Sequence, residues 1–352
     1  MIICVPTVWQ KLTGNIFQNL FMHKIFFLLT LLLWPFTLKS QTLPDSLTQE
    51  KMRIECDSFL ARMPQGLQHR QSEAVKTAIK GNNRALEDIR NGRNSAPVLP
   101  EDVQADYITP TLCLYRPKTE DDTPRPILLY LHGGGWAFGS INSCARFCAA
   151  VARTSGCYVA ALNYRLAPEH PFPAPLQDCI EAFRYLQSHA AEWGGDSTRI
   201  SIGGDSAGGN LALATGLSIP DVYSLIPIYP VTKIYTAPSA SWNRYATGYG
   251  CDAELLESFN TAYAGTEYQH PLASVALAAD SQLVQLPPML LISAGRDILY
   301  DQGKEWVERI QSLNKKIDHL VFPTATHLFI TVPGQPTAFD RAVQSVSAYL
   351  RQ

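Results

Sequence analysis

From about residue 107 to the C-terminus, short β-rich apolar runs alternate with longer stretches of helical periodicity. The expected strands are Thr111–Tyr115, Ile127–Leu131, Tyr158–Leu162, Ile200–Ile202, Ser224–Ile228, Met289–Ile292 and His319–Phe322. The expected helices lie between most of them, at about 141–154, 175–192, 207–217, 301–313 and 337–350. Nearly continuous apolar strands that alternate with helices are typical of parallel sheets covered on both faces. The pattern therefore predicts an α/β fold whose central sheet is mostly parallel.

Two parts of the chain fall outside this alternation. Residues 45–63 and 72–90 carry apolar side chains at helical spacing, whereas residues 91–106 are polar and proline-rich, which predicts a loop. Residues 232–286 lie between two expected strands and are rich in aromatic side chains. We interpret this segment as an insertion that forms a helical lid on an α/β domain of residues 107–352.

The N-terminal region contains an uncharged apolar run, Ile25–Phe36, between a basic flank and a polar stretch. The run is shorter than the ~20 apolar residues that span a bilayer, but it has the layout of a secretory signal. We expect residues 1–40 to be a signal peptide, with Met22 as the true start and the first 21 residues as a misassigned extension. The expected protein is exported, periplasmic or secreted, and an uncleaved membrane anchor is the alternative. N-terminal sequencing of protein from its own cell envelope would test this, with the mature end expected between about Ser40 and Pro44.

Composition excludes several classes of function. The 352 residues include 29 Lys plus Arg against 31 Asp plus Glu, a net charge of −2, so no basic field favours nucleic acid. The 8 cysteines are scattered, and those beyond the apolar run are odd in number, unlike a disulfide framework. Cys144 and Cys148 are four residues apart in an expected helix, but no His or Cys pair at ligand spacing lies nearby, so we interpret them as core residues. We expect no metal and no cofactor. The formation of one disulfide after export is an alternative that the sequence leaves open.

A G-x-S-x-G sequence, Gly204–Gly208, lies between the expected strand Ile200–Ile202 and an apolar helical stretch. In this context a tight strand-to-helix turn holds the central Ser206 in a strained conformation with its hydroxyl exposed. Glycines on either side avoid a clash between a Cβ and neighbouring backbone. A chance glycine-rich turn is the alternative, and the strand–turn–helix context favours a nucleophile elbow.

A glycine run, His132–Trp136, follows the expected strand Ile127–Leu131. Successive backbone N–H groups of such a run can point to one place and bind an oxyanion, together with the N–H of Ala207 directly after the nucleophile. Gly133 and Trp136 are the expected substrate-binding residues beside this loop. No lysine follows the run as in a P-loop and no G-x-G-x-x-G helix entry is present, so nucleotide binding is the weaker interpretation.

A serine nucleophile requires a general base, and the base requires an orienting acid. In folds with this elbow, the acid and then the histidine follow the serine along the chain. Asp297 and His327 each follow an expected strand, and the ends of such strands meet at the ligand-binding edge of a sheet. We therefore predict a triad of Ser206, Asp297 and His327. The weaker candidates are Asp301, which we expect to brace its turn, and His319, which falls in a strand.

Together these motifs resemble the hormone-sensitive lipase family of α/β-hydrolases, in the bacterial branch with a GDSAG elbow. The segments that carry the resemblance are His132–Trp136, Tyr164–Glu169, Phe172–Ala174, Gly204–Asn210 and Asp297–Leu299. The resemblance runs from about Thr111 to the C-terminus and implies an α/β-hydrolase fold, the triad above and an oxyanion hole of Gly134, Gly135 and Ala207. It also implies a helical cap built from N-terminal helices in residues 45–106 and the insertion at 232–286.

The sequence departs from the family pattern at two positions. Leu328-Phe329 follows the expected catalytic histidine where the family usually has Gly-Phe, and Asn163 replaces the common Asp before Tyr-Arg. Neither departure removes a reacting group. The first is expected to alter the loop beside His327 and hence the rate.

The expected function is hydrolysis of small-molecule carboxylic esters with short, acetyl-like acyl groups, through an acyl-enzyme. An amidase- or peptidase-type hydrolase with the same triad is one alternative, which parallel assays on an ester and an aminoacyl anilide would separate. A non-catalytic small-molecule-binding relative is the other. Such proteins tend to lose the catalytic histidine, and His327 is present here.

Overall fold

A computed structural model describes residues 45–118, 123–235 and 238–352. The expected signal peptide of residues 1–40, with Met22 as the true start, lies outside these residues and stays a prediction. Among the helices of the described ranges, none combines the length and apolar character needed to cross a bilayer.

The centre of the described chain is an 8-stranded sheet with the order β1-β2-β4-β3-β5-β6-β7-β8. Its strands are β1 (Val103–Thr109), β2 (Leu112–Pro117), β3 (Arg125–Leu131), β4 (Tyr158–Leu162), β5 (Gly195–Asp205), β6 (Leu225–Ile228), β7 (Met289–Arg296) and β8 (Ile317–Thr326). From β4 to β8 in this order the strands pair in parallel. β2 is antiparallel to both β4 and β1 at one edge. The expected mostly parallel sheet is confirmed.

β1 corrects the expectation that residues 91–106 form only a loop. Val103 begins a strand that pairs antiparallel with β2 up to Thr109. Only Val103 of its seven residues is fully buried, so the strand carries little of the apolar pattern by which a strand is recognised in sequence. Its position at the sheet edge explains this, because one side of an edge strand has no neighbour to cover it.

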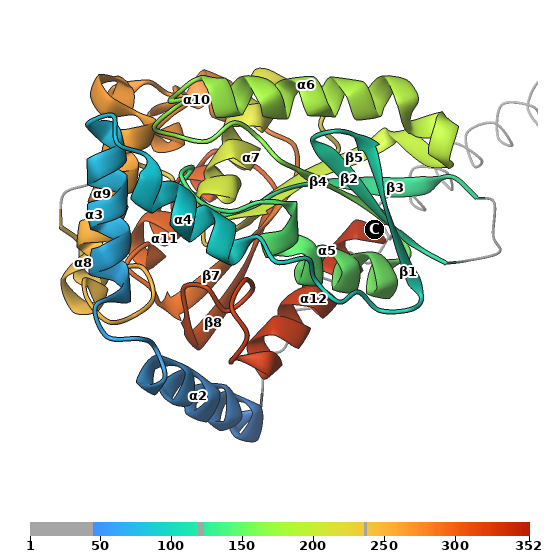
Figure 1. The fold of residues 1–352 in the computed structure, drawn as a ribbon. Coiled ribbons are helices and arrows are strands. Elements are labelled where there is room, and N and C mark those ends of the chain that lie inside the picture. Colours follow the sequence, from blue (N-terminus) through green and yellow to red (C-terminus); the bar gives the residue numbers. More distant parts are fainter. Residues whose placement is uncertain (1–44, 119–122, 236–237) are drawn as a thin grey trace, which may run out of the picture. The chain divides into compact units, whose positions relative to one another are not determined.

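Helices cover both faces of the sheet (Figure 1). The helices of one face are α5 (Ile141–Ser155) and α12 (Pro336–Leu350), and those of the other are α6 (Ala174–His189), α7 (Ala207–Ser218) and α11 (Tyr300–Ser312). Because neighbouring strand residues point to opposite faces, each central strand supplies both cores. In β3, Leu128 and Tyr130 join the core under α5 and α12, whereas Ile127 and Leu129 join the other.

Six of the seven cysteines in the described residues belong to these cores, the exception being Cys56. Each of the seven in the described residues is buried and has a free thiol. Cys144 and Cys148 lie on the face of α5 that packs against the sheet, within its hydrophobic core. Their spacing of four residues therefore reflects a buried helix face, and the expectation that they are core residues is confirmed.

The N-terminal helices are α2 (Ser46–Ala61), α3 (Leu67–Ile79) and α4 (Arg84–Arg93). Gly81 and Asn82 interrupt the helical pattern expected at 72–90, and the structure has two helices there, with Gly81, at φ 93°, in the turn between them. A positive φ is easily adopted only by glycine, so the chain turns there instead of continuing the helix. α2 packs against β8 and α12, and α3 packs against the insertion.

The insertion between β6 and β7 is mainly helical. Its elements are α8 (Ala240–Tyr245), α9 (Ala253–Tyr263), α10 (Asp280–Leu283) and the 3₁₀ turns Gly265–Gln269 and Val275–Leu277. Figure 1 shows α3 and α9 side by side at one end of the sheet. Ser72 on α3 and Ser258 on α9 share a buried hydrogen bond of 2.6 Å between their hydroxyl oxygens.

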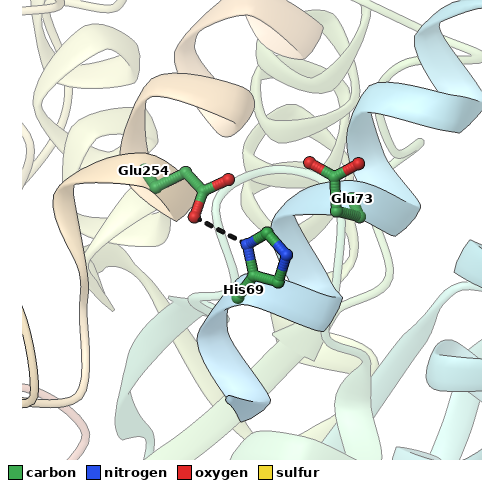
Figure 2. Close-up of side chains that lie close together, drawn as sticks. All are labelled: His69, Glu73 and Glu254. Carbon is green, nitrogen blue, oxygen red and sulfur yellow. Dashed lines mark hydrogen bonds and ion pairs between the residues drawn. The ribbon is translucent and has the colours of Figure 1, made fainter.

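Exposed charged groups also join α3 to α9. Figure 2 shows His69 and Glu73 of α3 facing Glu254 of α9, with His69 Nδ1 2.9 Å from a carboxylate oxygen of Glu254. Possible ligand atoms of these three side chains lie within 4.8 Å of one another, a spacing that suits a metal ion. Lys76, however, places its Nζ 2.6 Å from Glu254 and 3.0 Å from Glu73. Hydrogen bonds from Lys76 and then His69 lower the pKa of Glu254 to about 2. The Lys76 ammonium already pairs with both carboxylates, so we interpret the cluster as a set of ion pairs that joins two helices.

Candidate active site

Ser206 occupies a sharp turn between β5, which ends at Asp205, and α7, which begins at Ala207. Its φ is 56°, a conformation that L-residues rarely adopt. The backbone is therefore strained here, and the surrounding structure holds it in this conformation. The turn requires close contact with β3, because a Cβ on Gly208 would lie 1.9 Å from the carbonyl oxygen of Leu131. The local geometry is that of a nucleophile elbow.

The structure brings Ser206, His327 and Asp297 together at the carboxyl ends of β5, β8 and β7. Ser206 Oγ lies 3.0 Å from His327 Nε2, and His327 Nδ1 lies 2.6 Å from Asp297 Oδ2. A carboxylate can only accept a hydrogen bond, so Nδ1 carries the imidazole proton and Nε2 faces the hydroxyl as an acceptor. All three side chains are buried, and Asp297 Oδ1 also accepts from the backbone N–H of Leu299 at 2.9 Å.

The two weaker candidates lie elsewhere. Asp301 accepts a 2.7 Å hydrogen bond from the backbone N–H of Ser241 and thereby connects α11 to α8. His319 lies within β8, and its Nε2 is 2.9 Å from Ser293 Oγ. Neither side chain contacts Ser206 in the described structure.

The glycine run after β3 forms a loop beside Ser206. Gly134 and Gly135 have φ values of 113° and 61°, which turn their peptide groups in a way open to glycine. Among the described residues, the backbone N–H groups of Gly134, Gly135 and Ala207 have no hydrogen-bond acceptor. Ala207 is the first residue of α7, where N–H groups and the helix dipole favour negative charge. These three N–H groups are thus available to an oxyanion.

The two expected substrate-binding residues differ from these donors. Gly133 lines the cavity described below, but it gives its N–H to Asp205 Oδ1 at 3.0 Å and so has no donor for a substrate. Trp136 is fully buried and stacks on Tyr263 of the insertion, with ring centroids 4.2 Å apart and an interplanar angle of 2°. It also lines the cavity, where it can supply an apolar wall.

Sequence reasoning missed two residues at the site. Asp205, directly before the nucleophile, is buried and accepts hydrogen bonds from Tyr130 Oη at 2.9 Å and from the Gly133 N–H. Its position within the G-x-S-x-G motif was the available signal. Tyr229, just after β6, packs against the ring of His327 with centroids 4.5 Å apart. No motif marks Tyr229, because only the fold places it beside the histidine.

Burial raises the pKa of the Asp205 carboxyl from 3.8 to about 6, and the hydrogen bonds from Tyr130 and Gly133 oppose that rise. The folded protein therefore binds this proton more tightly than the unfolded chain does, and ionisation of Asp205 costs stability as pH rises from about 4 to about 6. Asp205→Asn keeps the accepting oxygen and cannot ionise. We expect the free energy of unfolding of the variant minus that of wild type to rise by about 3 kcal/mol between pH 4 and pH 6. Urea unfolding of both proteins at pH 4 to 7.5 checks this, and a pH-independent difference would contradict it.

Ser206 and His327 line a cavity of about 870 Å³, which we call the main cavity, and Asp297 contacts His327 without lining it. Its wall comes from the glycine loop, the N-terminal helices, the insertion and the segment after His327. Apolar side chains that line it include Phe59, Leu67, Leu255, Leu256 and Phe259. This volume is in the range of small-molecule sites in proteins.

The two departures from the family pattern have different consequences. Leu328 has φ 70°, a left-handed conformation that glycine adopts freely and that costs leucine on the order of 1 kcal/mol or more. Its side chain lines the main cavity and lies against Gly250, where a Cβ would be 3.3 Å from Leu328 Cδ1. Asn163 Oδ1 accepts from the N–H of Ile141 at 2.7 Å, so an acceptor is kept at the start of α5.

The sheet order, the elbow, and the glycine loop beside it define the chain as an α/β hydrolase. A family model described as alpha/beta hydrolase fold matches residues 128–331. Lipase 2 of Moraxella sp. (strain TA144) is 30% identical over 261 residues, 63% of this chain, and the match spans less than two thirds, 59%, of that lipase. The ethyl acetate hydrolase of Pseudomonas putida is 32% identical over 246 residues, 68% of this chain and 77% of that protein.

A solved structure extends the comparison to the three-dimensional fold. An ester hydrolase from the metagenome of Lake Arreo, in complex with a derivative of bipyridine phosphonate, has a TM-score of 0.67 and 28% identity. The match covers 88% of this chain and 100% of that one. The chain belongs to the hormone-sensitive lipase family of α/β hydrolases, and it is an ester hydrolase.

Proposed function

We propose that the protein is a serine carboxylesterase that acts through an acyl-enzyme intermediate. The observation that carries this proposal is the contact of His327 with Ser206 through one ring nitrogen and with Asp297 through the other. A serine hydroxyl becomes a competent nucleophile when a base with this orientation removes its proton.

In the acylation step, Ser206 Oγ attacks the ester carbonyl while His327 Nε2 takes the hydroxyl proton. Asp297 holds the imidazole in the required tautomer and stabilises the imidazolium that forms. The carbonyl oxygen becomes an oxyanion, which the N–H groups of Gly134, Gly135 and Ala207 bind. His327 then protonates the leaving alcohol.

In the deacylation step, a water molecule enters after the alcohol leaves. His327 accepts a proton from this water, which attacks the acyl carbonyl, and the same three N–H groups bind the second oxyanion. Collapse of that intermediate returns the proton to Ser206 and releases the carboxylic acid. No step in this sequence uses a metal or a cofactor.

We further propose that the acyl group is short and acetyl-like. An aromatic wall supports this proposal, because the Trp136–Tyr263 stack adjoins the glycine loop and a Cβ on Gly135 would lie 2.1 Å from the ring of Phe259. A relative in the family is named for the hydrolysis of ethyl acetate. The rest of the main cavity then accommodates the alcohol.

A series of p-nitrophenyl esters tests both parts of the proposal. Each methylene that the pocket can bury is worth about 0.8 kcal/mol, but a chain that outgrows the pocket meets a steric cost instead. We expect kcat/KM to peak between acetate and hexanoate and to collapse by dodecanoate. Hydrolysis that rises steadily to dodecanoate would refute the short acyl group and leave the esterase intact. Hydrolysis of an aminoacyl anilide without hydrolysis of any of these esters would refute the proposed esterase activity.

A further inference from the structure

Among the charged residues that line the main cavity, positive side chains outnumber negative ones. Three arginines, Arg62, Arg93 and Arg146, line it, whereas Asp205 is the sole acidic residue among the described lining residues. None of these arginines forms an ion pair with a carboxylate in the described part of the chain. This excess of positive charge stands out in a chain whose net charge is −2.

Arg93 is held in place by its surroundings although its guanidinium has no described hydrogen bond. It is the last residue of α4, and one turn earlier Arg90 donates to the carbonyl oxygens of Ala137 and Ala167 at 2.8 and 2.9 Å. The Arg93 guanidinium lies over the ring of Phe138, 5.1 Å from its centroid. Stacking on one face leaves the N–H groups at its edge free to bind a ligand.

Arg146 on α5 has a similar arrangement. Its guanidinium lies 3.7 Å from the centroid of the Phe339 ring, and its one described hydrogen bond, to the carbonyl oxygen of Ile330, is long at 3.4 Å. Desolvation lowers the pKa of both Arg93 and Arg146, and the negative charge of Asp340 opposes this effect at Arg146. Both side chains keep part of their surface exposed to solvent. Arg62, which donates to the Ser58 carbonyl oxygen at 3.0 Å, adds a third cation.

A guanidinium has five N–H donors in a planar fork and stays positively charged in proteins. Among the described residues no ion pair accounts for the positions of these cations, although the charge of Asp340 acts on Arg146 at longer range. A carboxylate ligand matches the fork and accepts two hydrogen bonds from it. The three arginines are exposed while Ser206 and His327 are buried in the same cavity, so the cations lie nearer its mouth.

We propose that the main cavity selects esters whose alcohol part carries a carboxylate, which Arg93 and Arg146 bind at the mouth while Ser206 reacts at the floor. This inference rests on the proposed esterase function and adds its substrate class. The short acyl group lies against the aromatic wall, so the remaining space, and the arginines with it, belongs to the alcohol. The positive mouth also attracts anionic substrates from solution.

The test compares two matched ester pairs at low salt. In the first pair, 4-acetoxybenzoate carries its anion on the alcohol part and 4-acetoxybenzamide is neutral. In the second pair, the p-nitrophenyl monoester of adipate carries its anion on the acyl part and p-nitrophenyl heptanoate is neutral. The measured quantity is the anion-to-neutral ratio of kcat/KM, compared between variants so that intrinsic ester reactivity cancels.

Arg93→Gln and Arg146→Gln are each expected to lower the ratio of the first pair about 10-fold, the usual size of a charge-assisted hydrogen bond. Arg93→Lys keeps the positive charge but not the planar fork of donors, so it should lower this ratio less than Arg93→Gln does. The matched control is Arg184→Gln on α6, which removes an exposed arginine that does not line the cavity and should leave the ratio at the wild-type value.

An unchanged ratio in the folded Arg93→Gln, Arg146→Gln double variant would overturn the inference, as would an equal fall in Arg184→Gln. An effect seen only in the second pair would overturn the placement of the anion on the alcohol. Hydrolysis of both neutral esters in these cases would show that the esterase itself stands. Absence of hydrolysis of all four esters by the wild-type protein would instead refute the proposed function.

Discussion

Ser206→Ala protein is expected to fold normally and to lose ester hydrolysis by up to ~10⁶-fold, the scale seen when the nucleophile of a serine hydrolase is removed. The hydroxyl is the group that forms the acyl bond, so His327 and Asp297 have nothing to activate without it. Loss of one hydroxyl at a position 8% exposed leaves the surrounding packing in place. Steady-state hydrolysis of p-nitrophenyl acetate and labelling by a fluorophosphonate measure the effect.

The matched control is Ser188→Ala. Ser188 is an exposed serine on α6 whose hydroxyl donates only to backbone carbonyl oxygens within its helix. Its replacement should leave turnover and labelling at wild-type levels. Substantial turnover by well-folded Ser206→Ala protein would reject Ser206 as the nucleophile. A wild-type protein that neither turns over esters nor reacts with the fluorophosphonate would favour the non-catalytic alternative.

Gly134→Ala is expected to lower kcat by about 10²- to 10³-fold, the loss seen when one oxyanion-hole donor is removed. At φ 113° an L-residue is strained, and the added Cβ would lie 2.7 Å from the Phe138 carbonyl oxygen. The loop must shift to relieve this clash, and the N–H groups of Gly134 and Gly135 then no longer point at the oxyanion. Because the oxyanion exists only along the reaction path, KM should change far less than kcat.

Gly81→Ala controls for backbone strain alone. Gly81 also has a positive φ, 93°, but a Cβ there meets no atom within 4 Å and the position does not line the main cavity. Thermal unfolding of both variants should reveal a stability loss in each, with the kcat effect restricted to Gly134→Ala. A Gly134→Ala protein with wild-type kcat would remove this loop from the oxyanion hole.

The parts of the site that could be predicted from sequence are those encoded by local motifs. Ser206 is marked by its strand–glycine–helix context, and Asp297 and His327 follow strands that are apolar enough to recognise. β1 escaped prediction because Val103 alone of its residues is fully buried, so pairing with β2 rather than its own pattern defines it.

Other features depend on contacts between distant segments and have no local signature. The hydrogen bond from Gly133 to Asp205 joins residues 72 positions apart, and it makes Gly133 a support of the loop as well as a residue that lines the cavity. The left-handed conformation of Leu328 follows from the fold around it, although the family pattern signals that a glycine would suit the position. The arginines at the mouth of the cavity come from the residue after α2, from α4 and from α5, so no motif could have assembled them.

The reacting groups and the cavity wall come from different parts of the architecture. Ser206, Asp297 and His327 follow strands of the sheet, whereas much of the wall comes from α2–α4 and the insertion. Substitutions in these outer segments can thus alter which alcohols and acids fit while the chemistry keeps its rigid support. A chimera that exchanges residues 45–102 with those of another family member should therefore inherit the donor's substrate range without a change of catalytic residues.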